Sequence, residues 1–178
     1  MYFRKMIGKK CYLSPIDIGD AEKYTEWLND LEVTINLQQY SKNLDVNTEK
    51  QKLAEMAKGH NYSIVEKETE KLIGNCSFLQ IDNFNQTGEV GIFIGDKNYW
   101  SKGYGTEALI LLLDYGFKAL NLHNVELSVY SFNIRAIKSY EKIGFKFIGK
   151  RRQAIRRGKE TYDKIYMDIL ENEFYEKK

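Results

Sequence analysis

The feature that most constrains the fold is a short apolar run that leads, through a glycine-containing turn, into a long amphipathic segment. The run from Glu89 to Gly95 is apolar and closed by glycine, which is typical of a buried strand. Beyond the turn, apolar residues recur at helical spacing, mostly on one broad face: Ala108, Leu109, Leu111, Leu112, Leu113, Tyr115 and Phe117. The pattern predicts a strand that leads directly into the N-terminus of a helix.

The turn itself, from Trp100 to Thr106, has residue types that suit an anion. The first N–H groups of a helix lack internal partners, and the helix dipole places partial positive charge there. Gly103 and Gly105 have no side chains to keep a diphosphate from the backbone, and Lys102 adds a positive charge. A Gly-x-Gly pair alone is equally well explained as a loop that merely turns the chain.

The turn resembles the acetyl-CoA-binding signature of the GNAT N-acetyltransferase superfamily, Arg/Gln-x-x-Gly-x-Gly/Ala. Here the segment reads Trp100-Ser101-Lys102-Gly103-Tyr104-Gly105-Thr106. Trp100 stands where the signature has arginine or glutamine. In this respect the turn is similar to that of the RimJ/RimL-type branch, and a contact between this side chain and the cofactor is less expected. The resemblance implies that the segment from Trp100 to Thr106 surrounds the pyrophosphate of acetyl-CoA.

A second motif follows in the expected order. Leu122 to Val129 predicts a strand, and the helix after it ends in glycine. This part resembles the superfamily's Asn-x-x-Ala-x-x-x-Tyr-x-x-x-Gly-Phe element, here Asn133, Ala136, Tyr140, Gly144 and Phe145. Earlier in the chain, Trp27 to Val33 is similar to the Trp-Leu-Asn-Asp-x-Glu-Val pattern of RimJ/RimL-type enzymes.

The resemblance implies an α+β fold in which a central, mostly antiparallel and twisted sheet is flanked by helices. In that family the fourth and fifth strands splay apart and leave backbone groups unpaired. Phe93, Ile94 and Gly95 are therefore expected to contact the pantetheine arm of acetyl-CoA, and the unpaired groups to polarise its thioester carbonyl. Asn133 is expected to bond the pantetheine as well.

The resemblance also implies two catalytic residues. Related enzymes use a tyrosine at the position of Tyr140 to protonate the sulfur of the coenzyme, and a phenol with a pKa of about 10 can donate a proton at neutral pH. Many relatives carry a glutamate at the position of Glu89, which usually removes the amine proton through water. From the residues alone, Tyr140 could be a packed helix tyrosine and Glu89 a surface ion-pair partner.

The acceptor is expected to be a primary amine: a protein N-terminus, a polyamine, an amino sugar or an aminoglycoside. Spermidine acetyltransferase is similar across the cofactor half, but its acidic cluster after the first helix is absent, since Leu37 to Ser41 stands there. Lys150 to Lys159 holds six positive charges in ten residues, which fits a solvated hairpin, an acidic partner or the ribose phosphate of the cofactor. The alternative function is a non-catalytic acyl-CoA-binding or RNA-associated module.

Composition narrows the class of protein. At 178 residues with 43% hydrophobic content, the chain is expected to form one domain over residues 1–178, as a monomer or homodimer. A net charge of +2 does not demand nucleic acid or a membrane, and no apolar run or secretion signal indicates one, so a cytoplasmic location is expected. Cys11 and Cys76 are expected to be buried thiols, and two isolated histidines predict no metal.

The remaining pattern predicts a first strand from Ile7 to Ile16 and a helix that starts near Asp17 or Asp20. Gly74, inside a predicted strand, indicates a β-bulge or a close approach of another backbone. Three further elements are predicted: a helix from Thr48 to Gly59 capped by Asn47 or Thr48, a hairpin from Tyr62 to Ile81, and a hairpin that turns at Gly158-Lys159.

Overall fold

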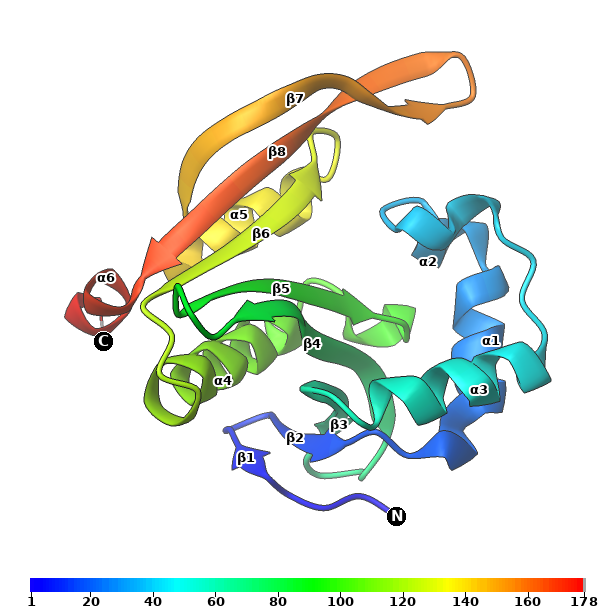
Figure 1. Cartoon of the computed structure of the whole chain (residues 1–178). Coiled ribbons are helices and arrows are strands. Elements are labelled where there is room, and N and C mark those ends of the chain that lie inside the picture. The colour runs from blue at the N-terminus through cyan, green and yellow to red at the C-terminus, as the bar shows by residue number, and fades with distance from the viewer. Residues whose placement is uncertain (178) are drawn as a thin grey trace. The chain divides into compact units, whose positions relative to one another are not determined.

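The computed structural model describes residues 1–177 and divides the chain into two compact units. Unit 1 consists of Met1–Phe78 and Ile92–Leu112, and unit 2 consists of Leu79–Gly91 and Leu113–Lys178. Two strands and one long helix run through both units (Figure 1). The expectation of a single domain stays a prediction.

Unit 1 contains strands β1 (Met6–Ile7), β2 (Cys11–Pro15), β3 (Asn61–Glu66) and most of β4 (Leu72–Asp82). β1 and β2 pair antiparallel, with Met6 opposite Leu13. The predicted single strand from Ile7 to Ile16 is therefore wrong, because the chain reverses direction after Gly8. The Gly8 N–H donates to the Cys11 carbonyl oxygen at 2.8 Å, which closes the turn.

β3 and β4 form the predicted hairpin, but their pairing slips by one residue at Ile73. The extra residue makes a β-bulge, and its carbonyl oxygen accepts the Gly95 N–H at 2.9 Å. Next to it, a Cβ on Gly74 would lie 2.2 Å from the carbonyl oxygen of Phe93. Both features that Gly74 predicted, a bulge and a close backbone approach, are confirmed.

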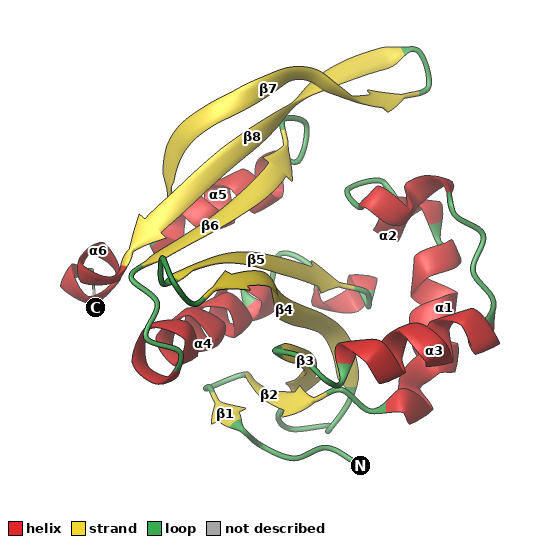
Figure 2. Ribbon diagram, viewed as in Figure 1, coloured by secondary structure: helices red, strands yellow, loops and turns green. Residues whose placement is uncertain are grey.

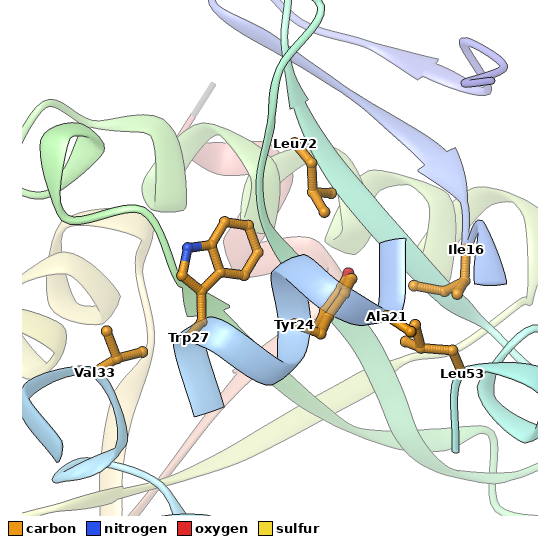
Figure 3. Packing of buried hydrophobic residues seen from close by; sticks show 7 residues of the cluster. All are labelled: Ile16, Ala21, Tyr24, Trp27, Val33, Leu53 and Leu72. Carbon is orange, nitrogen blue, oxygen red and sulfur yellow. The ribbon is translucent and has the colours of Figure 1, made fainter. Parts of the chain in front are cut away.

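The helices of unit 1 are α1 (Ala21–Asn29), α2 (Leu31–Thr34) and α3 (Val46–Met56). The Asp17 carboxylate caps a 3-10 turn that leads into α1, as predicted. α3 is capped by Asp45 instead of the predicted Asn47 or Thr48, because the Asp45 carboxylate accepts both of their N–H groups. These helices share one apolar core with β4 (Figure 3), made of Ile16, Ala21, Tyr24, Trp27, Val33, Leu53 and Leu72.

The predicted strand-turn-helix is confirmed as β5 (Thr87–Ile94) and α4 (Tyr104–Ala119). The apolar face of α4 is buried, with five residues at most 3% exposed: Ala108, Leu109, Leu112, Leu113 and Phe117. Burial of this stripe fixes the rotation of the helix about its axis. The glycine-containing turn before it remains at the surface.

Unit 2 contains β6 (Asn124–Tyr130), α5 (Ile134–Ile143), β7 (Lys146–Arg157), β8 (Glu160–Leu170) and α6 (Glu171–Glu176). β8 lies between β6 and β7 and pairs antiparallel with both. Lys164 of β8 pairs with Tyr130, the last residue of β6, so the β7–β8 hairpin runs on past the end of that strand (Figure 1). Its turn at Gly158-Lys159 is confirmed.

Strand neighbours follow the order β1-β2-β3-β4-β5-β6-β8-β7, and helices flank the strands (Figure 2). β5 and β6 pair parallel, and their register covers only Thr87–Glu89 opposite Asn124–Glu126. The fold is thus the predicted mixed α/β class with a mostly antiparallel sheet. Within residues 1–177, no helix is both long and apolar enough to cross a lipid bilayer.

Candidate functional site

The predicted site residues fall into two groups, one in each unit. Unit 1 contains the end of β5 and the whole turn from Trp100 to Thr106. Unit 2 contains Glu89 on β5, together with Asn133 and Tyr140 at α5. Each group has its own geometry.

In unit 1, the loop before α4 uses two left-handed backbone positions, Ser101 with φ 59° and Gly103 with φ 86°. The Gly103 carbonyl oxygen accepts the first helical hydrogen bond, from the Glu107 N–H at 3.0 Å. The N–H groups of Tyr104 and Gly105 precede that bond, at positions where a helix offers no internal acceptor. The loop therefore presents backbone donors where an anion can bind.

The two glycines of this turn serve different needs. Gly103 is required by its positive φ, which side chains disfavour. Gly105 is not required by packing, since a Cβ there would only make ordinary contact with the Ile94 side chain at 3.6 Å.

Trp100 supports the end of β5 from inside. Its side chain packs against the core cluster of Figure 3, and its indole N–H donates to the Ile94 carbonyl oxygen at 2.7 Å. The expectation that backbone groups at Ile94 are unpaired is therefore wrong for this carbonyl, because the indole reaches it.

Phe93 and Gly95 are held by packing on α1. The Phe93 ring makes edge contacts with Tyr24 and with Trp27, each at 6.2 Å between ring centroids. A Cβ on Gly95 would lie 2.1 Å from the Trp27 indole, and the Gly95 N–H is already bonded to the β4 bulge. These contacts fix the course of the backbone at the end of β5.

Sequence reasoning missed two residues beside the α4 turn. Lys10, from the β1–β2 turn, donates from Nζ to the Lys102 carbonyl oxygen at 2.7 Å and lies 5.7 Å from the centre of the Tyr104 ring. Glu107 holds this turn in place, since its Oε1 accepts the Lys10 N–H at 2.7 Å. The sequence signal for the turn that holds Lys10 was Gly8 followed by two lysines. This composition is typical of a turn, but it lay inside the predicted strand.

In unit 2, Tyr140 is half-buried on α5, and its ring makes an edge contact with Phe145 at 5.9 Å. Burial raises the pKa of the Tyr140 phenol to about 12. Within the described residues, the hydroxyl group has no recorded hydrogen-bond partner. A half-buried hydroxyl of this kind leaves a donor for water or a ligand.

Asn133 begins the same helix. Its side-chain oxygen accepts the Ala136 N–H at 3.2 Å and so caps α5. Capping uses the oxygen and leaves the side-chain NH₂ group as a donor. Asn133 therefore has a structural task in addition to any contact with a ligand.

Glu89 is half-buried on β5 and lies directly opposite Glu126 of β6 in the parallel register. Side chains paired in this way lie on the same face of a sheet, about 5 Å apart at their Cα atoms. Two neighbouring carboxylates repel each other and attract a cation. The arrangement can attract an ammonium group.

The cysteines are buried free thiols, as predicted. Burial and the nearby Glu107 carboxylate raise the pKa of Cys11 to about 12. Burial raises the pKa of Cys76 well above its ordinary value. Among residues 1–177, no group of three or more His, Cys, Asp or Glu side chains is arranged to hold a metal ion.

Comparison with known proteins adds independent findings. The sequence model of the acetyltransferase (GNAT) domain matches residues 10–146. The uncharacterized N-acetyltransferase p20 of Bacillus licheniformis is 29% identical over 167 residues, covering 91% of this chain and 93% of that protein. The spermidine N(1)-acetyltransferase of Escherichia coli is 37% identical over 87 residues, covering 49% of this chain and 46% of that protein.

Solved structures of acetyltransferases share the fold. A GNAT acetyltransferase from Bacillus anthracis superposes with a TM-score of 0.83 at 24% identity, covering 97% of this chain and all of that one. The spermidine N-acetyltransferase of Vibrio cholerae, solved with CoA and spermine, superposes with a TM-score of 0.83 at 20% identity, covering 94% and 99% of the two chains.

Proposed function

Because this chain belongs to the GNAT acetyltransferase family and is an acetyl-CoA-dependent N-acetyltransferase, we propose that it transfers the acetyl group directly to a primary amine, with Tyr140 as proton donor and Glu89 as base. The observation that carries the proposal is the Tyr140 hydroxyl group, half-buried and without a recorded hydrogen-bond partner in the described chain. We further propose that the enzyme is of the RimJ/RimL type and cytoplasmic, with the turn at Trp100 and the segment from Trp27 to Val33 as support for the type.

The residues of the α4 turn fit the cofactor. Acetyl-CoA supplies an activated thioester and a diphosphate. The N–H groups of Tyr104 and Gly105, together with Lys10 and Lys102, are the donors and charges that would hold the diphosphate. Phe93 and Ile94 would contact the pantetheine arm through their remaining backbone groups, and Asn133 through its NH₂ group.

The chain's own residues then move two protons. Glu89, beside Glu126, attracts the acceptor ammonium and removes one proton, directly or through water, so that the nitrogen lone pair can attack the acetyl carbonyl carbon. Tyr140 would donate its phenolic proton to the departing sulfur, and the second proton that the nitrogen loses as the amide forms would return through water to the Tyr140 phenolate. Because the pKa of Tyr140 is raised, the phenol is protonated at neutral pH and can act as a general acid.

Direct transfer is supported by the state of the two thiols. A cysteine must be a thiolate to accept the acetyl group in a covalent intermediate. Burial keeps both Cys11 and Cys76 protonated, and both are fully shielded from solvent. Neither thiol therefore competes with the acceptor amine.

An acceptor screen that detects the free thiol of CoA tests the proposal. Acetyl-CoA is offered with a protein N-terminal peptide, a polyamine, an amino sugar and an aminoglycoside. We expect thiol release that depends on one of the amines and a product that contains the acetyl amide. CoA binding without amine-dependent release from any class would instead indicate a non-catalytic module.

We also propose that Lys10 binds the diphosphate of the cofactor. Its ammonium group is fixed at the α4 turn by the Lys102 carbonyl, and it lies 3.4 Å from where a Cβ of Gly103 would be. Replacing Lys10 with glutamine is expected to raise the Kd for CoA about three- to tenfold, the size of one partly solvated ion pair.

Isothermal titration with CoA and with dephospho-CoA measures this effect. Lys9→Gln is the matched control, since it removes the same charge from the next residue of the same exposed turn. A loss of equal size for both ligands assigns Lys10 to the diphosphate. A loss confined to CoA would assign it to the ribose phosphate and contradict the proposal, as would equal Kd values for the Lys9 and Lys10 variants.

A further inference from the structure

The β7–β8 hairpin of unit 2 has a concentration of positive charge that the acetyl transfer itself does not use. Between Lys146 and Lys159 the chain contains seven basic residues and no acidic one. Most of this strand is exposed, including Arg151 and Arg152. Like charges at this density repel one another unless an anion is bound nearby.

A bulge arranges these charges. Arg151 pairs with Lys164 and Ile155 with Tyr162, so β7 carries two extra residues between the pairs. Gln153, inside the bulge, has a left-handed backbone with φ 49°. Its N–H donates at 2.9 Å to the carboxylate of Asp163 on the facing strand. The bulge is therefore held in one conformation by a specific contact.

The Asp163 carboxylate is already engaged. One oxygen accepts the Gln153 N–H, and the other forms a 2.7 Å ion pair with Lys150. Neither Arg151 nor Arg152 forms a salt bridge within the part of the chain that the structure describes. The Arg152 guanidinium helps to lower the pKa of the Asp163 carboxyl group, so its charge is partly balanced, but neither guanidinium group is held in an ion pair within residues 1–177.

An open surface pocket lies at this bulge, lined by the exposed residues Arg151, Arg152 and Gln153. Two guanidinium groups beside an amide offer planar, forked donors, which match the oxygens of a phosphate or a carboxylate. The lining of the pocket therefore selects an anion.

The register of the strands gives the distance along the sheet between Glu89 and the pocket. Glu89, Glu126 and Asp168 lie side by side on β5, β6 and β8. Four residues further along β6, Tyr130 lies beside Lys164, which in turn lies beside Arg151. Residues an even number apart on a strand share a face, and four residues span about 13 Å.

The basic end of this face has further support. The Arg157 guanidinium lies 5.2 Å from the centre of the Tyr130 ring, so it also approaches the end of β6. An acidic row at Glu89 and a basic row at Arg151 thus stand on one face of the same three or four strands. Such a face fits a molecule that is positive at one end and negative at the other.

We propose that the acceptor is an amine that carries an anionic group, phosphate or carboxylate, about 13 Å from its amino group, and that Arg151 and Arg152 bind this group. The proposal rests on the assignment of Glu89 to the amine in the proposed function. It narrows the acceptor to small amines with a distant phosphate or to peptides with an acidic side chain, and it excludes polycations such as spermidine, which the basic row repels.

Matched acceptor pairs test the proposal. Aminoalkyl phosphates of increasing length are compared with the corresponding amino alcohols, and a peptide with glutamate at its fourth residue is compared with its glutamine counterpart, since four extended residues span about 13 Å. We expect the anionic member of one series to have a kcat/KM about 10- to 100-fold higher. The series that responds identifies the source of the anion.

Arg151→Gln with Arg152→Gln is expected to abolish this preference, leaving the KM for acetyl-CoA unchanged. Lys50→Gln with Lys58→Gln removes the same charge from two exposed lysines, one on α3 and one in the turn after it, and should keep the preference. The inference would be overturned if the wild type turned over anionic and neutral acceptors equally or preferred spermidine. It would also be overturned if the arginine double variant changed only the KM for acetyl-CoA. Absence of transfer to any amine would instead contradict the proposed function.

Discussion

Replacing Tyr140 with phenylalanine is expected to lower kcat about 100- to 10,000-fold, the usual contribution of a general acid. The ring keeps its contact with Phe145, and no recorded hydrogen bond within the chain is lost, so the fold should be unaffected. What disappears is the proton for the departing sulfur. Thiol release under saturating acetyl-CoA and acceptor measures kcat, and titration with CoA is expected to give an unchanged Kd.

Tyr175→Phe is the matched control, because it makes the same change at another tyrosine of unit 2 that has no proposed catalytic role. The Tyr175 hydroxyl group donates to the Asp114 carboxylate at 3.5 Å. This control should turn over at the wild-type rate. A Tyr140 variant with wild-type kcat, together with an intact melting curve, would remove Tyr140 from the mechanism.

The pH dependence gives a second test of the same residue. The pKa of Tyr140 is raised to about 12, above its ordinary value, so the phenol stays protonated as pH rises and begins to ionise only near that value. The Tyr140 variant should therefore lower the pH–kcat profile between about pH 6 and pH 10 by a constant factor. An alkaline loss of activity in that range that is present in the wild type and absent from the variant would contradict the assignment.

The second large effect concerns Gly74. Replacing it with alanine should reduce the free energy of unfolding by about 3 kcal/mol, at the upper end of the usual cost of overpacking. The added Cβ would lie 2.2 Å from the Phe93 carbonyl oxygen and 2.9 Å from the Ile94 Cα, and both of these are backbone atoms that cannot rotate away. β4 and β5 would have to move apart, and we expect CoA binding to weaken with them.

Gly149→Ala provides the control, since a Cβ at that strand position meets no atom within 4 Å. Its free energy of unfolding should stay within about 0.5 kcal/mol of the wild type. Urea unfolding of the three proteins makes the comparison. Similar midpoints for Gly74→Ala and Gly149→Ala would show that the close approach of β4 and β5 is not tightly constrained.

The strand, turn and helix that would hold the cofactor could be predicted from sequence because their information is local. A glycine turn between an apolar strand and an amphipathic helix specifies backbone donors at a helix N-terminus, and β5, the turn and α4 follow this pattern. The helix of Asn133 and Tyr140 is specified in the same way, by spacing and a terminal glycine. Each of these features depends on residues a few positions apart.

Other parts of the site could not be predicted, because they depend on residues far apart in the chain. Lys10 lies 92 positions before Lys102, whose carbonyl oxygen it contacts. The Trp100 indole N–H reaches the Ile94 carbonyl oxygen because its ring packs against the core cluster, whose residues come from distant parts of the chain.

By itself, the sequence determined most of the longer strands and helices, the family and the residue types of the α4 turn, since hydrophobic period and glycine placement act over one or two turns of chain. Only the tertiary structure decided which cation stands beside that turn, which carbonyl is already bonded, and that Glu89 and Arg151 share a face of the sheet. The reason is that strand register and side-chain packing join distant segments, and no local pattern in a single sequence encodes those pairings.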